Sequence, residues 1–206
     1  MLFLGDNVSL PALAGIVLGM LAGITTHEFS HAFVADMLGD HRPRALGRVS
    51  LNPLRHLDPL GTVLLVLVGI GWGKPVPVAV EALRPGRVGM SFVAGAGPVA
   101  NVVVALALAL TFRVVDLAGT EGAVLQLLYV ATVVNLLLAI LNLIPIPPLD
   151  GFALVTALVP PRWEYSIRRY QGYGVVLLLL LLIIPNSPLG AILGLAYPWA
   201  ALLCGI

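Results

Sequence analysis

The sequence predicts an all-α protein that crosses a membrane several times. Three observations support this prediction: 59% of the 206 residues are hydrophobic, only 10% are charged, and the mean hydropathy is +1.02. Soluble domains carry about 25% charged residues, and disordered chains combine low hydrophobicity with high net charge, whereas the net charge here is +1. The basic residues form no patch suited to nucleic acid. We therefore expect a lipid bilayer around the chain and no nucleic-acid partner.

Three segments are apolar over the roughly 20 residues that a helix needs to span a bilayer. In chain order they are residues 10–38, 90–115 and 123–144. Shorter apolar stretches lie at 61–72, 174–184 and 188–206. The first two of these shorter stretches cover only about half a bilayer as helices, so each is predicted to be re-entrant, tilted or extended by its flanks.

The run Lys74-Pro75-Val76-Pro77-Val78 cannot be helical, because its prolines block helix hydrogen bonding and bias the preceding residues to extended geometry. We predict a short extended or re-entrant segment near residues 61–80, at the membrane surface. The whole chain, 1–206, is predicted to be a single integral membrane domain. Its three-helix core lies within about 10–160, and additional C-terminal spans lie within about 170–206.

The basic residues predict an orientation. Ten of the eleven lysines and arginines fall on one side if 61–72 enters and leaves the bilayer by the same face; the exception is Arg113, in the turn between the second and third long spans. The positive-inside rule assigns the basic side to the cytoplasm. The sequence therefore predicts a multi-pass protein of the cell membrane with its N-terminus outside and its basic loops in the cytoplasm.

Ionisable residues inside apolar spans are expensive and often functional. His27-Glu28-Phe29-Ser30-His31 places three of them in the first span with the spacing H-E-x-x-H. Positions i and i+4 share one helix face, so both imidazoles can reach one zinc ion, and the glutamate between them can act on a water beside it. The alternative is that these polar residues only join helices through hydrogen bonds. Three such residues in this arrangement argue against it.

A catalytic zinc usually takes a third protein ligand. Asp150 is the preferred candidate, because it follows Asn142-Leu-Ile-Pro-Ile-Pro-Pro-Leu, where three prolines prevent a regular helix. Non-helical backbone at membrane depth has to be buried in protein or line a cavity. The other candidate ligands are Asp36, His41 and His56, which the spans place near or in the basic loop.

These motifs resemble the site-2 protease family of intramembrane zinc metalloproteases. The resemblance rests on the H-E-x-x-H motif together with the run from Asn142 to Asp150-Gly151, and covers roughly residues 20–160. Further matching pieces are Asn52-Pro53-x-x-His56-x-Asp58-Pro59-x-Gly61, Gly73-Lys74-Pro75-Val76-Pro77-Val78 and Gly97-Pro98-x-x-Asn101. The PDZ and regulatory domains usual in that family have no counterpart in this sequence, so a compact form is expected.

The resemblance implies one zinc ion per chain, held by His27, His31 and Asp150, and hydrolysis of peptide bonds within or near transmembrane segments of membrane-protein substrates. Glu28 is then the general base, taking a proton from the attacking water and passing it to the leaving amine. We suggest that Asn142 stabilises the oxyanion, although a role in joining helices is nearly as attractive. Asn101 is interpreted as a helix-packing residue.

Two rival functions remain open at this point. A zinc-binding membrane transporter or scaffold without proteolytic activity would also place histidines and aspartates within the membrane, but has no need of Glu28. A membrane zinc peptidase that cuts soluble tails would need an extramembrane chamber, for which the sequence provides no segment. The extended segment near Pro75 offers strand-like pairing to an unwound substrate; the alternative is a surface turn with no such role.

Overall fold

The computed structural model describes residues 8–59, 61, 73–120, 122–160, 162, 167, 169 and 171–206. Its main helices are α1 (Leu10–Met37), α4 (Arg87–Leu117), α5 (Ala123–Asn142), α6 (Asp150–Leu158), α8 (Gly174–Ile183), α9 (Pro188–Gly194) and α10 (Ala196–Cys204). Short turns of helix lie between them: α2 (Arg42–Ala45), η1 (Pro53–Arg55), η2 (Val80–Ala82) and η3 (Gln171–Tyr173). The described residues form no strand beyond one isolated bridge between Leu57 and Gly73. The predicted all-α membrane fold is confirmed.

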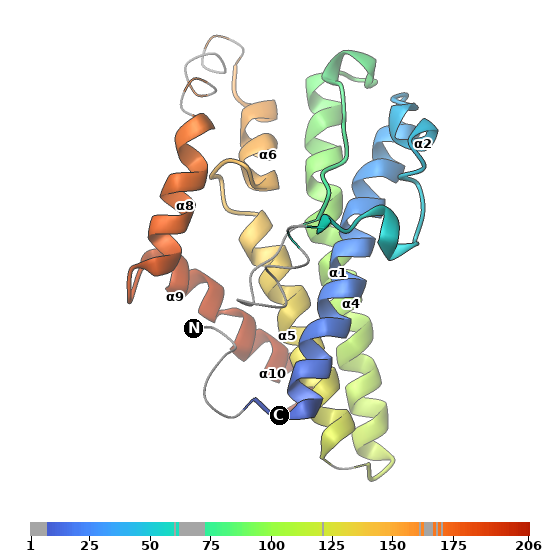
Figure 1. Ribbon diagram of the computed structural model, residues 1–206, viewed down its shortest axis with the longest axis vertical. Coiled ribbons are helices and arrows are strands. Elements are labelled where there is room, and N and C mark those ends of the chain that lie inside the picture. Colours follow the sequence, from blue (N-terminus) through green and yellow to red (C-terminus); the bar gives the residue numbers. More distant parts are fainter. Residues whose placement is uncertain are drawn as a thin grey trace.

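The three predicted long spans are α1, α4 and α5, which are each long and apolar enough to cross a membrane. They pack side by side as a three-helix core (Figure 1). Helix α1 begins where the Ser9 hydroxyl accepts a hydrogen bond from Ala12 N and Pro11 occupies the first turn, both favourable at a helix start. The helix then runs without interruption through the polar residues 25–28. Thr25 and His27 are buried, and the Thr26 hydroxyl donates to the Ala22 carbonyl of its own helix at 2.8 Å, so the polar residues fit without a break in the helix.

Small residues let α1 approach α5 closely. Gly15, Gly19 and Gly23 are all buried on one side of α1. A Cβ atom on Gly19 would come within 2.9 Å of the Ala131 Cα on α5, and one on Gly15 would come within 2.6 Å of the Leu127 carbonyl oxygen. Helices in membranes use such stripes to bring their backbones together. The close approach brings Asn135 of α5 to the α1 backbone, where its Nδ2 atom donates to the Gly19 carbonyl at 3.2 Å.

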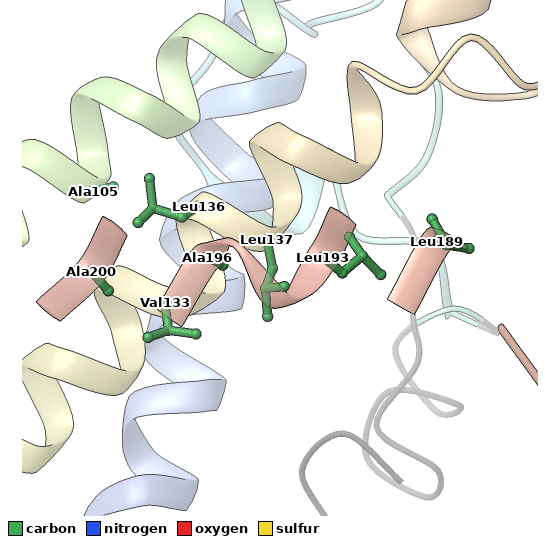
Figure 2. Close-up of a cluster of buried hydrophobic side chains, with 8 residues drawn as sticks. All are labelled: Ala105, Val133, Leu136, Leu137, Leu189, Leu193, Ala196 and Ala200. Carbon is green, nitrogen blue, oxygen red and sulfur yellow. The ribbon is translucent and has the colours of Figure 1, made fainter. Parts of the chain in front are cut away.

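The C-terminal helices cover one side of this core. Figure 2 shows Leu189, Leu193, Ala196 and Ala200 of α9 and α10 packed with Val133, Leu136 and Leu137 of α5 and with Ala105 of α4. The prediction of an apolar helix at 174–184 is confirmed by α8. The apolar stretch 188–206 forms two helices, α9 and α10, which are divided at Leu195. Pro198 explains the break, because its ring and missing N–H disrupt the helix around residue 194, four positions earlier.

One end of the molecule gathers the segments that carry most of the basic residues. The Arg84 N–H donates to the Leu38 carbonyl just after α1, and Arg87 at the start of α4 donates to the Thr156 and Val159 carbonyls at the end of α6. The turn between α4 and α5 lies at the opposite end (Figure 1). Arg84 and Arg87 therefore lie near the end of the molecule opposite to that turn, and the side of the membrane that the basic loops face stays a prediction. The predicted re-entrant stretch falls on 62–72, outside the described residues.

Residues 74–79 form no regular secondary structure, as the prolines predict. The segment is tied down at both of its ends. Arg48, only 5% exposed, donates from its guanidinium to the Lys74 and Pro75 carbonyls and to the Arg55 carbonyl. At the other end, the Asp40 carboxylate accepts from the Ala79 N–H at 2.9 Å, while the hydrogen-bonded Arg42 guanidinium lowers the pKa of Asp40 to about 2. Asp40 is therefore ionised, and holds the segment, throughout the physiological pH range.

Candidate metal centre

Three metal-type donor groups meet between α1 and α6. His27 and His31 project from the same face of α1, as their spacing predicts, and Asp150 is the first residue of α6. The two Nε2 atoms lie 3.0 Å apart, and Asp150 Oδ2 lies 3.0 Å from that of His27 and 3.2 Å from that of His31. His27 is about 15 Å from the Met37 end of α1 at 1.5 Å per residue. The cluster therefore lies deep among the apolar helices.

The prolines after α5 bring Asp150 to this position. The chain between Asn142 and Asp150 makes tight turns in place of a helix, so α6 restarts beside α1 with Asp150 at its N-terminus. Gly151 packs against the Leu143 and Ile144 carbonyl oxygens, which leave no room for a Cβ atom. Each residue of the Asp-Gly pair therefore has its own structural reason. The aspartate faces the histidines, and the glycine permits the close turn behind it.

Each imidazole is held from behind through its Nδ1 atom. His27 Nδ1 lies 2.7 Å from the Asn101 side-chain oxygen of α4, and His31 Nδ1 lies 2.7 Å from the Val93 carbonyl oxygen of the same helix. An Nδ1–H donor in this position leaves the Nε2 lone pair available to a metal. Hydrogen bonds of this kind normally orient histidines that bind metals.

This donor set fits a zinc ion. Ligand bonds of about 2.0–2.2 Å at tetrahedral angles separate donor atoms by roughly 3.3 Å, and the three separations here are 3.0, 3.0 and 3.2 Å. Two neutral imidazoles and one carboxylate are also the ligand type of several catalytic zinc sites, which keep a fourth position for water. Among the described residues, this is the one cluster with three such groups.

A cavity of about 460 Å³ opens beside the cluster. Its lining includes the three donor residues, Glu28, Asn142 and the segment residues Pro75, Val76 and Val78. Glu28 lies against the backbone of Gly73, where a Cβ atom would come within 3.0 Å of the Glu28 Oε1. Asn142 uses one amide N–H on the Leu138 carbonyl at 2.9 Å, which leaves a second N–H of its NH₂ group. The structure thus brings Glu28 and Asn142 to the same cavity.

The other candidate ligands, Asp36, His41 and His56, have different partners. Asp36 accepts from Arg44 and pairs with His41, and His56, fully buried, lies 2.6 Å from the Ser50 carbonyl through its Nε2. None of these three residues belongs to the donor cluster in the described part of the chain. They organise the loop after α1.

Sequence reasoning missed two features of the site. Asn101, interpreted as a packing residue, does join α4 to the Gly23 carbonyl of α1, but it also contacts His27 directly. Asn135 was not singled out, although a lone asparagine in the middle of an apolar span is a signal, and it lies behind Asn101 at 3.4 Å. The fold and this site together define a class of protein: a polytopic membrane hydrolase that uses a metal ion.

The comparisons with known proteins agree. Residues 112–184 match the model of Peptidase family M50. A relative named "Putative zinc metalloprotease YwhC" from Bacillus subtilis is 35% identical over 176 residues, 82% of this chain and 80% of its own length. Two further relatives are named "Putative zinc metalloprotease Rip2". The one from Mycolicibacterium smegmatis is 34% identical, and the match covers 82% of this chain and 67% of the relative. The one from Mycobacterium tuberculosis is 31% identical, and the match covers 98% of this chain and 80% of the relative. No solved structure matches at a comparable level.

The chain belongs to peptidase family M50, the site-2 protease family, and is a zinc metalloprotease. The expected enzyme class and the expected zinc cofactor are confirmed. The rival of a transporter or scaffold is not supported. The residues that hold the metal and carry out the hydrolysis stay predictions.

Removal of Asp150 provides a direct test of the ligand set. We expect the Asp150→Ala variant to lose the zinc that wild-type protein retains at about one per chain, because two imidazoles alone leave the site without its anionic ligand. Metal analysis after dialysis against a weak chelator measures this. Asp116→Ala, which removes an exposed aspartate of α4, is the matched control. One zinc per chain in Asp150→Ala would exclude Asp150 as a ligand.

Proposed function

We propose that this zinc metalloprotease cleaves peptide bonds within or near transmembrane segments of membrane proteins, as in regulated intramembrane proteolysis. One observation carries the proposal: the cavity with Glu28 and the donor cluster lies between candidate membrane spans, and apolar residues such as Met90, Leu138 and Leu141 line it. A peptide bond that reaches Glu28 therefore comes from a segment accommodated among apolar side chains.

The chemistry follows from the groups in the cavity. His27, His31 and Asp150 would hold the zinc ion, which would act as a Lewis acid on a peptide carbonyl and would lower the pKa of a nearby water. Glu28 lies about 100° from His27 around the helix, so it faces the same cavity without being a ligand. It takes a proton from the attacking water and returns it to the amine that leaves. The second N–H of Asn142 stabilises the negative charge that develops on the carbonyl oxygen.

The 74–79 segment is proposed to bind the unwound substrate as a strand. Adjacent residues of an extended chain point their N–H and C=O groups to opposite edges. Pro75 and Pro77 share one edge and have no N–H groups, whereas Val76 and Val78 share the other. Among the described residues, no backbone group pairs with Val76 or Val78, and both residues line the cavity. Their edge can therefore pair with a substrate beside Glu28.

Proline at position 78 tests this pairing. Val78→Pro removes one N–H from the free edge, and one hydrogen bond is worth about 0.5–1.5 kcal/mol net. We expect kcat/KM to fall roughly 2- to 10-fold, mainly through KM, with zinc content unchanged. Pro77→Ala is the matched control, because it changes a proline on the opposite edge. An unchanged KM in Val78→Pro would exclude this mode of binding.

The proposed function is tested with purified protein in lipid vesicles and two single-span model substrates. The two substrates have the same amino-acid composition, but only one has its glycine and proline as a pair inside the apolar segment, where the pair unwinds the helix. We expect cleavage of the unwound substrate at a bond within or next to its apolar segment, identified by mass spectrometry. Glu28→Gln serves as the inactive control. Cleavage confined to the soluble tails of both substrates would contradict the proposal and favour a peptidase of soluble segments.

The orientation is proposed from the charge distribution, with the basic end of the molecule in the cytoplasm. We expect single cysteines at Leu46, beside α2, and at Ala118, after α4, to react with a membrane-impermeant reagent from opposite sides of intact cells. Leu46 should be labelled from the cytoplasm. Both residues are exposed, and the single native cysteine, Cys204, is replaced first. Labelling of both positions from the same side would contradict α4 as a single crossing.

A further inference from the structure

We propose that Asn101 and Asn135 are positioning residues that fix the tautomer of His27 and thereby increase the affinity of the site for zinc. The proposal rests on the metal-binding role of His27 given under the proposed function. It concerns a chain of hydrogen bonds that begins on α5, passes through α4 and ends on α1. All of its side chains lie inside the three-helix core.

The chain begins at two backbone carbonyls, which can only accept hydrogen bonds. The Asn135 Nδ2 atom lies 3.2 Å from the Gly19 carbonyl oxygen and 2.9 Å from the Ala131 carbonyl oxygen. Both contacts require a donor, so the amide nitrogen has to face these carbonyls. The Asn135 oxygen consequently faces Asn101, as an acceptor.

The orientation of Asn101 follows from the same reasoning. Its Nδ2 atom donates to the Gly23 carbonyl at 3.1 Å and to the Asn135 oxygen at 3.4 Å. The Asn101 oxygen therefore faces His27 Nδ1, at 2.7 Å, and can only accept. His27 must carry its proton on Nδ1. Its Nε2 lone pair then points to His31 and Asp150, as a metal ligand requires.

The burial of the two asparagines means that this chain of hydrogen bonds alone sets the tautomer of His27. Asn101 and Asn135 are both 0% exposed, so water cannot replace a lost partner without a rearrangement of the core. If the Asn101 amide were reversed, its NH₂ group would face His27 Nδ1 and favour a proton on Nε2, which blocks metal binding. His31 needs no such chain, because the Val93 carbonyl fixes its tautomer directly. The two asparagines therefore act on His27 alone.

Zinc affinity, measured by competition with a chromophoric chelator, is the main readout. We expect Asn101→Leu to weaken zinc binding by about 10- to 100-fold, the usual effect of removing a partner behind a metal-binding histidine. Asn135→Leu should weaken it less, since the Gly23 carbonyl still holds Asn101. Thr132→Val is the matched control: Thr132 is equally buried on α5, but its hydroxyl donates to the Leu128 carbonyl of its own helix. Its zinc affinity should equal that of wild type.

A double-mutant cycle separates positioning from general packing. If Asn135 acts through Asn101, Asn135→Leu should change zinc affinity little once Asn101→Leu is present. Additive losses would overturn the proposal, because they would show two independent effects on the core. Thermal unfolding of the metal-free proteins reports any loss of fold separately.

The conservative variant Asn101→Asp provides a second test that does not depend on the leucine variants being folded. It keeps an oxygen facing His27 Nδ1–H, and in its protonated form its O–H replaces the amide as the donor to the Gly23 carbonyl, so it should retain the zinc affinity that Asn101→Leu loses. Equal affinities for Asn101→Leu, Asn135→Leu and Thr132→Val would overturn the proposal. That result is distinguishable from a failure of the proposed function, which concerns the cleaved substrate and leaves zinc affinity unaffected.

Discussion

Glu28→Gln should bind zinc as tightly as the wild type and cleave its substrate at least about 100-fold more slowly, since a general base typically contributes 100- to 10,000-fold in rate. Glutamine has nearly the same size as glutamate and can still form hydrogen bonds in the cavity beside Gly73. It cannot take the proton of the attacking water. The loss should therefore appear in kcat, with little change in KM.

Glu81→Gln is the matched control for this experiment. It makes the same chemical change at an exposed glutamate of η2, outside the cavity, and should leave both zinc content and turnover unchanged. Turnover by Glu28→Gln at close to the wild-type rate, with its zinc retained, would contradict the mechanism and require a different base.

Gly97→Ala should abolish zinc binding although it places the better helix former in α4. A Cβ atom at this position would lie 2.5 Å from His31 Nε2 and 2.6 Å from His27 Nε2. Zinc–nitrogen bonds measure about 2.0–2.1 Å, so the added methyl group occupies the space in which the two ligand atoms converge. Either the histidines move apart or the metal is excluded. Metal analysis should find no zinc retained by Gly97→Ala, and activity should be lost with it.

The same substitution two residues earlier provides the control. Gly95 lies on the same helix, and a Cβ atom there would meet nothing within 4 Å. Gly95→Ala should retain zinc and activity and should not lower the thermal stability. If Gly97→Ala retained a full zinc content and normal turnover, the metal would have to bind elsewhere than between His27 and His31.

Much of this architecture could be predicted from hydropathy and from one motif. The long spans are apolar over 20 residues or more, and the pair His27 and His31 follows from helix periodicity alone. The choice of Asp150 over Asp36 was an inference from the prolines before it, and the structure places Asp150 in the cluster. The contact itself depends on tertiary structure, because only the turn after α5 brings residue 150 to the height of residue 27.

Other features could not be predicted for physical reasons. The division at Leu195 lies within a uniformly apolar stretch, so hydropathy gives no signal of it, and Pro198 was the available indication. The roles of Asn101 and Asn135 depend on which helix faces which, and apolar spans of similar composition do not specify their neighbours. The contact of Gly97 with both histidines likewise depends on the distance between α1 and α4.

The anchor of the 74–79 segment has a consequence for how the sequence can change over evolutionary time. Arg48 recognises this region through main-chain oxygens of Arg55, Lys74 and Pro75, and through no side chain of those residues. Every amino acid offers the same oxygen, so positions 55 and 74 are free to drift in charge and size while the anchor persists. Selection then acts on the one arginine and on the path of the backbone, so the side chains of the segment can change without a cost to the contacts that hold it.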